Sequence, residues 1–119
     1  MLIEWLPRIG AGLMLIIGLV GFFKPRAFTE NMQIELNSNM ALSEARTVFG
    51  GLNVGGGLMG LLLHTPPVYI TLGTAWFFGL LARFYSMLAD GSTLKESIPG
   101  ITVDLVMAGL LLSGFYLSA

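Results

Sequence analysis

Long, mostly apolar runs alternate with short polar segments along the whole chain. A helix needs roughly 17 to 25 mostly apolar residues to cross the hydrocarbon core of a bilayer. Four runs reach this length, over residues 5–23, 45–64, 67–88 and 100–118. The pattern therefore predicts an all-α integral membrane protein, a four-transmembrane-helix bundle that forms a single domain over residues 1–119.

Composition supports a lipid environment. Of the 119 residues, 55% are hydrophobic and only 11% are charged, which is far from the composition of a water-soluble domain. The opening "MLIEW" carries a glutamate and no lysine or arginine, so the first run is interpreted as a helix and not as a cleavable signal peptide. The absence of cysteine excludes disulfides and thiolate metal sites, and the absence of a basic tail gives no support for nucleic-acid binding.

The links between the runs differ in length. "HTPP", residues 64–67, is a tight reversal, which predicts that the second and third helices pack as an antiparallel pair. Residues 24–43 form the one substantial loop, and its apolar residues suit a position on the bilayer interface or against the bundle. The third link, "DGSTLKESIPG", begins with a turn signal and ends at Pro99-Gly100.

The distribution of lysine and arginine predicts the orientation. The first and third links, with the adjoining helix ends, carry five of these residues, and the opposite side carries only Arg8. We therefore expect a multi-pass membrane protein with both termini outside the cytoplasm.

The second run is rich in glycine. Gly51 and Gly55, like Gly56 and Gly60, have the small-x-x-x-small spacing that lets membrane helices approach closely, and Gly50 extends the small surface. This spacing predicts that the second helix is central and the most buried of the four. A homodimer-forming face is the alternative interpretation.

Charged and polar residues recur near the predicted cytoplasmic side. Because a charge that faces lipid costs roughly 2.5 to 3.5 kcal/mol or more, such residues turn inward and pair. Depth matching predicts that Arg83 pairs with Asp104, or else with Glu44. The cluster is a structural ion-pair knot, a polar pocket for an anionic head group or small carboxylate, or a proton or ion path through Asp104 and Asn53. Its members are Glu44, Arg46, Asn53, Arg83, Asp90 and Asp104.

Little other chemistry is available. His64 is the only histidine, so imidazoles build neither a metal cluster nor a catalytic triad, and we expect no metal, no cofactor and no enzyme activity. By elimination, we expect a small non-enzymatic protein that binds a lipid or small amphiphile, or that is an accessory subunit of a membrane complex. A homo-oligomer is possible in either case. The alternatives are a small oligomeric transporter or channel, and a lipid head-group enzyme with Asp104 or Glu44 as general base.

Several motifs resemble those of the bacterial membrane-protein family described as domain of unknown function 4345. They are Pro25-x-x-Phe28, "IEL" at 34–36, Ser43-Glu44-x-Arg46-x-x-Phe49-Gly50-Gly51-Leu52, and "GLLARFYSMLADG" at 79–91. The resemblance covers nearly the whole chain and implies a small four-helix protein of the bacterial inner membrane with no settled activity. It also implies that Glu44, Arg46, Arg83 and Asp90 form a linked set.

Overall fold

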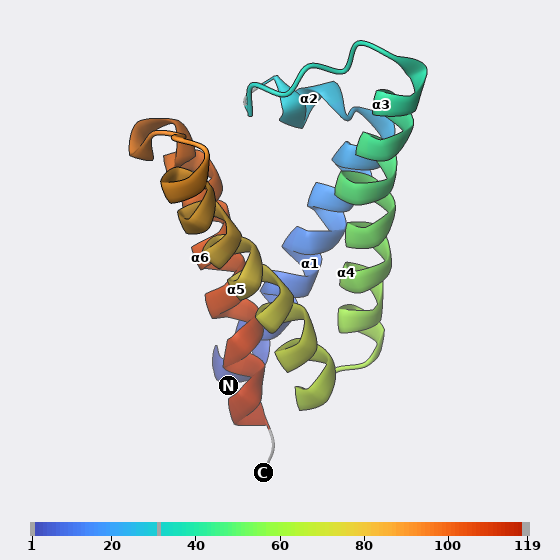
Figure 1. Ribbon diagram of the computed structural model, residues 1–119. Coiled ribbons are helices and arrows are strands. Elements are labelled where there is room, and N and C mark those ends of the chain that lie inside the picture. The colour runs from blue at the N-terminus through green and yellow to red at the C-terminus, as the bar shows by residue number, and fades with distance from the viewer. Residues whose placement is uncertain (1, 31, 118–119) are drawn as a thin grey trace.

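The computed structural model describes residues 2–30 and 32–117, and every regular element in these ranges is helical (Figure 1). The elements, in chain order, are α1 (Leu2–Phe23), α2 (Arg26–Thr29), α3 (Asn39–Ala45), the π-helix η1 (Arg46–Gly51), α4 (Leu52–Leu62), α5 (Pro66–Ala89), α6 (Leu94–Leu112) and the 3-10 helix η2 (Ser113–Leu117).

The second predicted helix begins several residues before the apolar run that predicted it. Ser38 caps α3, because its hydroxyl oxygen accepts a hydrogen bond from the backbone nitrogen of Ala41 at 3.0 Å. The junction residues Arg46 and Leu52 both have right-handed helical dihedral angles, so α3, η1 and α4 follow one another without a break. The helix predicted over 45–64 therefore begins at Asn39 and ends at Leu62.

Helix α6 also begins earlier than the predicted 100–118. Thr93 and Glu96 form a capping box, which satisfies free backbone donors at both positions and starts the helix at Leu94. Pro99 lies in the second turn, where its missing N–H removes a single hydrogen bond and the helix continues. The helix ends at Leu112 and is followed by η2, and the rest of the predicted range lies outside the described residues.

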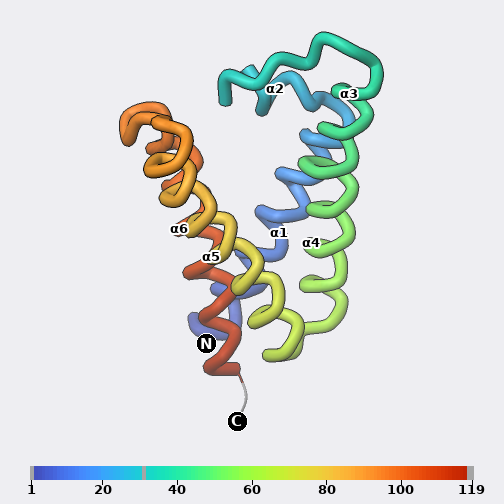
Figure 2. Tube along the Cα trace, viewed as in Figure 1, coloured from blue at the N-terminus to red at the C-terminus, as the bar shows by residue number. Residues whose placement is uncertain are grey.

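The molecule is built from two arms, α1 with the continuous helix 39–62, and α5 with α6. The arms contact each other near the chain termini and diverge toward the end that carries α2, as Figures 1 and 2 show. The prediction that the second and third helices pack as a pair is wrong, because the tight link holds only the adjoining ends of α4 and α5 together. Beyond that link, α4 packs along α1 and α5 packs along α6.

Helix α1 holds the central position that the glycine pattern assigned to the second helix. It packs against α4 and η1 on one side and against α6 and η2 on another. Small residues allow this, since half of its buried positions are glycine. The buried residues of α1 are Pro7, Gly10, Ala11, Met14, Gly18 and Gly21, against four in the continuous helix 39–62: Ala45, Gly50, Gly57 and Gly60.

The glycines of the second helix divide between two faces. A Cβ atom at Gly50 would lie 2.6 Å from the Cα of Phe22, and Gly56 and Gly60 are similarly close to Met14 and Ala11 of α1. Gly57, which completes this face, lies against the backbone of Leu15. These glycines let α1 approach closely.

Gly51 and Gly55 do not belong to this face. A Cβ atom at Gly55 would meet nothing within 4 Å, and one at Gly51 only the Arg46 carbonyl at 4.0 Å. The packing role predicted for these two residues is therefore wrong for contacts among the described residues. Their spacing identifies a small surface but not the direction in which it faces.

A compact buried cluster joins the two arms. It contains Ala11, Met14, Tyr69, Met107 and Leu111, so it draws on α1, α5 and α6. Tyr69 and Leu111 are fully buried. This cluster holds the arms together at one end and leaves them apart at the other.

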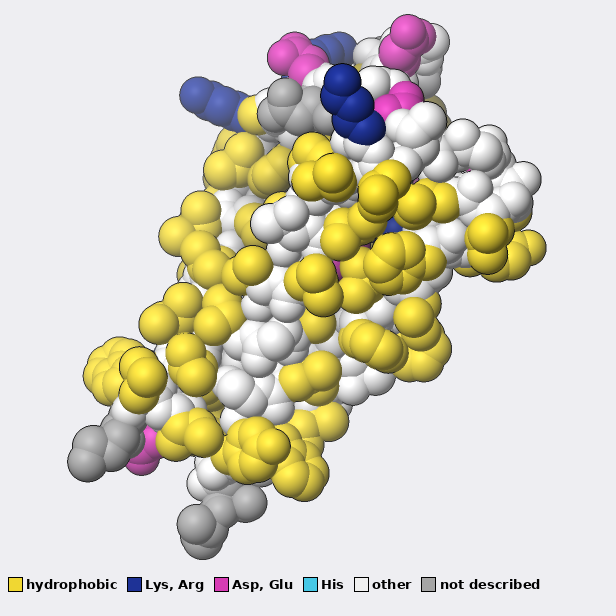
Figure 3. All heavy atoms as spheres, turned by 90° about the vertical axis from the view of Figure 1, so that its left-hand side faces the viewer, with side chains coloured by type: hydrophobic (Ala, Val, Ile, Leu, Met, Phe, Trp, Pro, Cys, Tyr) yellow, Lys and Arg dark blue, Asp and Glu magenta, His cyan; other side chains and the backbone are white. Residues whose placement is uncertain are grey.

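The outer surface suits a lipid environment. Among the residues that the structure describes, three helical stretches are long and apolar enough to cross a membrane: Leu2–Phe23, Pro66–Ala89 and Leu94–Leu117. In Figure 3, charged side chains gather mostly at one end of the molecule, and hydrophobic side chains cover much of the body below. The structure is thus all-helical with three candidate membrane spans.

Candidate functional site

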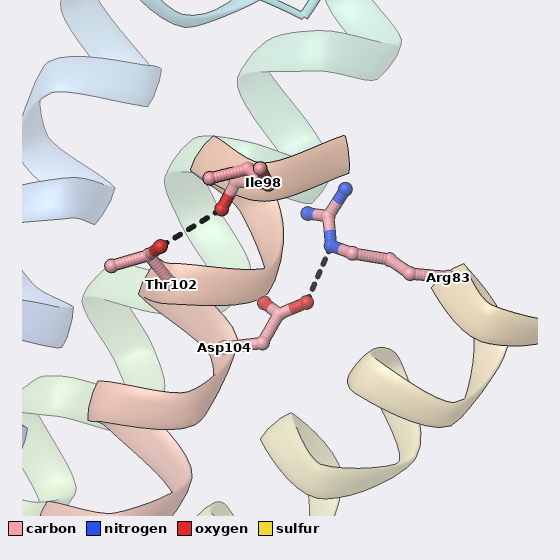
Figure 4. Close-up of polar contacts among 4 residues, drawn as sticks. All are labelled: Arg83, Ile98, Thr102 and Asp104. Carbon is pink, nitrogen blue, oxygen red and sulfur yellow. Dashed lines mark hydrogen bonds and ion pairs between the residues drawn. The ribbon is translucent and has the colours of Figure 1, made fainter. Parts of the chain in front are cut away.

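An ion pair joins α5 to α6 (Figure 4). The Nε atom of Arg83 donates a hydrogen bond to Oδ2 of Asp104 at 2.5 Å. Asp104 is 3% exposed, whereas the Arg83 side chain is 36% exposed. This confirms the predicted pairing, and its physical reason holds: a buried carboxylate among apolar helices needs a cation beside it.

The rest of the Arg83 guanidinium takes no part in this ion pair. Its two terminal nitrogens point away from Asp104 in Figure 4, and within 2–30 and 32–117 neither has a hydrogen-bond partner. The group lies against Gly100, where any Cβ atom would overlap it. Thr102 donates to the Ile98 carbonyl at 2.9 Å and so takes no part in the pair. Arg83 therefore keeps unused donors.

A cavity of about 280 Å³ lies beside this pair, between the two arms. Asn53, Arg83 and Asp104 are its strongly polar lining residues. The remaining lining is mostly apolar: Ile17, Phe28, Met32, Phe49, Trp76, Pro99, Gly100 and Val103. The cavity thus combines an apolar wall with a few polar groups, the usual composition of a small-molecule site.

A second, polar hollow of about 340 Å³ adjoins the first. The two share Met32, Arg83, Pro99 and Gly100. The hollow adds polar residues from the loop, from α5, from the link after α5 and from the start of α6: Gln33, Ser86, Ser92, Glu96 and Ser97. Arg83 therefore lies at the boundary between an apolar and a polar space.

The π-helical turn shapes the opposite wall. The backbone nitrogen of Leu52 donates to the carbonyl of Thr47, five residues earlier. The Asn53 side chain then donates to the Phe49 carbonyl at 3.0 Å. Such turns are rare within helices and often mark functional sites. Phe49 also packs against Phe28 of α2, with ring centroids 6.4 Å apart, so the turn and the loop meet over the cavity.

The other predicted site residues lie elsewhere. Arg46 donates to the carbonyls of Phe22 and Phe23, and so caps the end of α1. Asp90 is exposed and accepts a hydrogen bond from Ser86 at 2.8 Å. Glu44 is exposed. The structure brings Asn53, Arg83 and Asp104 to one cavity, and it does not assemble the linked set that the resemblance implied.

Sequence analysis missed most of the cavity wall. Trp76 reads as an ordinary core or lipid-facing aromatic residue, and Phe28 and Met32 read as apolar loop residues. The only available signal was the apolar character of the loop, since a site built between two diverging arms leaves no spacing pattern in the chain.

A second polar cluster lies at the other end of the molecule. Arg8 donates to Nδ1 of His64 at 3.3 Å, and the Tyr69 hydroxyl lies 2.7 Å from the same nitrogen. Arg8 also lies over the Trp5 ring, 5.1 Å from its centroid. These contacts tie the link between α4 and α5 to α1. No group of three His, Asp or Glu residues suited to a metal ion occurs in the described part of the chain.

The fold and the cavity define a class: a small, all-helical protein with apolar candidate membrane spans and a polar ion pair facing an internal cavity. Residues 4–115 match the family described as Domain of unknown function (DUF4345), and the chain belongs to this family. No curated protein and no solved structure matches the chain.

Proposed function

We propose that this protein is a non-enzymatic, four-span protein of the inner membrane that binds a lipid or small amphiphile in the cavity between its two arms. The cavity, with its apolar wall and the partly unused Arg83 donors, is the observation that carries the proposal. The pairing of Asp104 with Arg83 argues against a general-base role for this carboxylate.

The fourth span is the continuous helix over residues 39–62. Its 24 residues would extend about 36 Å at the usual rise per residue, enough for a hydrocarbon core of about 30 Å. The five lysine and arginine residues of the first and third links and adjoining helix ends support a cytoplasmic position for that side. Both termini would then lie outside the cytoplasm.

Cavity size suggests a narrow ligand. A volume of about 280 Å³ lies just below the roughly 300 to 1,000 Å³ that is typical of small-molecule pockets. It therefore suits one short acyl segment or a small head group, with the remaining chain in the bilayer. The adjoining polar hollow offers space for hydrated groups.

Trp76 provides a direct test, because it lines the cavity and the chain has only one other tryptophan, Trp5 in the first turn of α1. In a Trp5→Phe variant in detergent micelles, a brominated single-chain amphiphile should quench Trp76 fluorescence saturably at about one molecule per protein. Val103→Phe, which places a larger side chain in the cavity, should abolish the saturable quenching. Val106→Phe, at a comparably exposed position of the same helix outside this cavity, should retain it. Quenching that rises linearly in all variants would refute the proposal.

An accessory role in a larger assembly, or a homo-oligomer, is the second candidate. The open surface at Gly51 and Gly55, beside the exposed Leu52, would accept a helix of another chain at close range. Native mass spectrometry from mild detergent tests the homo-oligomer: a dimer that Gly55→Leu converts to monomer would support it, and a monomer throughout would contradict it.

A further inference from the structure

The charges around the cavity restrict the kind of head group that it accepts. We infer that this head group is uncharged and carries a hydrogen-bond acceptor, such as an ester or ketone carbonyl, that lies against the terminal nitrogens of Arg83. This inference rests on the proposed amphiphile binding and adds the chemical class of the ligand.

The ion pair supplies hydrogen-bond donors, but its two opposite charges leave little net electrostatic attraction for a charged ligand. Arg83 and Asp104 are the charged residues that line the apolar cavity, and they neutralise each other at 2.5 Å. An anionic head group would gain attraction from Arg83 but would meet repulsion from Asp104. It would also lose its hydration, which costs far more for a charge than for a neutral polar group. The pair therefore leaves too little attraction to offset the transfer of an anion.

A cationic head group fits less well. Asp104 is 3% exposed and its Oδ2 atom is held by Arg83, so a cation would have to lie beside the guanidinium. Glu96 lines the adjoining hollow, but its carboxylate is exposed and already accepts a hydrogen bond from the backbone nitrogen of Thr93 at 3.0 Å. Solvent at this position screens its attraction.

A carbonyl oxygen satisfies the site at lower cost. It accepts from the unused Arg83 donors, and hydrogen bonds to charged groups are stronger than those between neutral groups. It adds no charge to the neutral pair. Its attached chain can then follow the apolar wall formed by residues such as Phe49 and Trp76.

Competition for the brominated probe tests the inference. Four unlabelled competitors of equal chain length, a methyl ester, a sulfonate, a trimethylammonium and an alkane, are compared at equal mole fraction in the micelle. The ester should displace the probe at about tenfold lower concentration than each of the others. Displacement by the sulfonate or the ammonium at lower concentration than the ester would overturn the inference while leaving amphiphile binding intact. Absence of any saturable quenching by the probe would overturn both.

A pair of glycine variants tests the role of Arg83 without changing charge. Gly100→Ala places a methyl group where the guanidinium lies, so the flexible end of Arg83 must move. Gly109→Ala, on the same helix, meets nothing within 4 Å. The ratio of the alkane concentration to the ester concentration that displaces the probe should fall several-fold in Gly100→Ala and should be unchanged in Gly109→Ala. An unchanged ratio in Gly100→Ala would show that Arg83 does not hold the head group.

Discussion

Two glycines two positions apart on α4 should respond oppositely to the same substitution. A Cβ atom at Gly57 would lie 2.5 Å from the backbone nitrogen of Leu15 and 2.8 Å from the carbonyl oxygen of Ala11. Ordinary contact begins at 3.4 Å, so α1 and α4 would have to separate locally by about 0.9 Å, the difference between 3.4 and 2.5 Å. Overpacking of this kind typically costs about 1 to 3 kcal/mol. Because backbone atoms cannot rotate away, Gly57→Ala should destabilise the protein.

Gly55→Ala is the matched control, since a Cβ atom there meets nothing within 4 Å. Each substitution also gains up to about 1 kcal/mol of helix propensity, and this gain cancels when the two variants are compared. Their free energies of unfolding should therefore differ by about 1 to 3 kcal/mol, with Gly57→Ala the less stable. The assay is equilibrium unfolding in mixed micelles with increasing denaturing detergent, followed by circular dichroism. Equal stability of the two variants would refute the close packing of α1 on α4.

Two further predictions concern charged residues, and a third concerns the orientation in the membrane. Arg83→Leu and Asp104→Leu should each lower the free energy of unfolding by about 3 to 5 kcal/mol, and the double variant should recover part of this loss; additive losses would show that the pair is not coupled. Arg46→Gln should lower the free energy of unfolding by about 1 to 2 kcal/mol, because the last carbonyls of α1 lose their hydrogen-bond donor. Glu44→Gln, at an exposed position, should be as stable as the wild type. Equal stability of the two variants would show that Arg46 does not cap α1. A cytoplasm-active reporter should be silent when fused after the last residue and active when inserted near Asn37, and the reverse pattern would reject the proposed orientation.

The ion pair could be predicted from sequence because depth in a bilayer is a strong constraint. Arg83 and Asp104 each lie near the same end of an apolar run, and an unpaired charge at that depth is costly, so few arrangements remain. The same reasoning fails for Arg46. At the end of a helix, backbone carbonyls compete with carboxylates for a guanidinium, and the adjacent end of α1 supplies two of them.

Helix packing could be predicted only in part. The small-x-x-x-small spacing correctly placed Gly56 and Gly60 in a close contact. It did not indicate that Gly51 and Gly55 face away from that contact, or that the partner is α1. The tight link between α4 and α5 fixes only where those helices begin to diverge. The cavity depends on how far the arms separate, which is a property of the whole assembly and leaves no local pattern in the chain.

A structure of the protein purified with its native lipids would show whether the cavity between the arms holds an amphiphile. We expect elongated density between the two arms, in contact with Trp76 and ending at the terminal nitrogens of Arg83, while Arg83 remains paired with Asp104. We also expect Phe28 and Phe49 to cover this density from the loop and the π-helical turn. A closed interface, with α5 packed directly along α4 and no space beside Arg83, would contradict amphiphile binding between the arms.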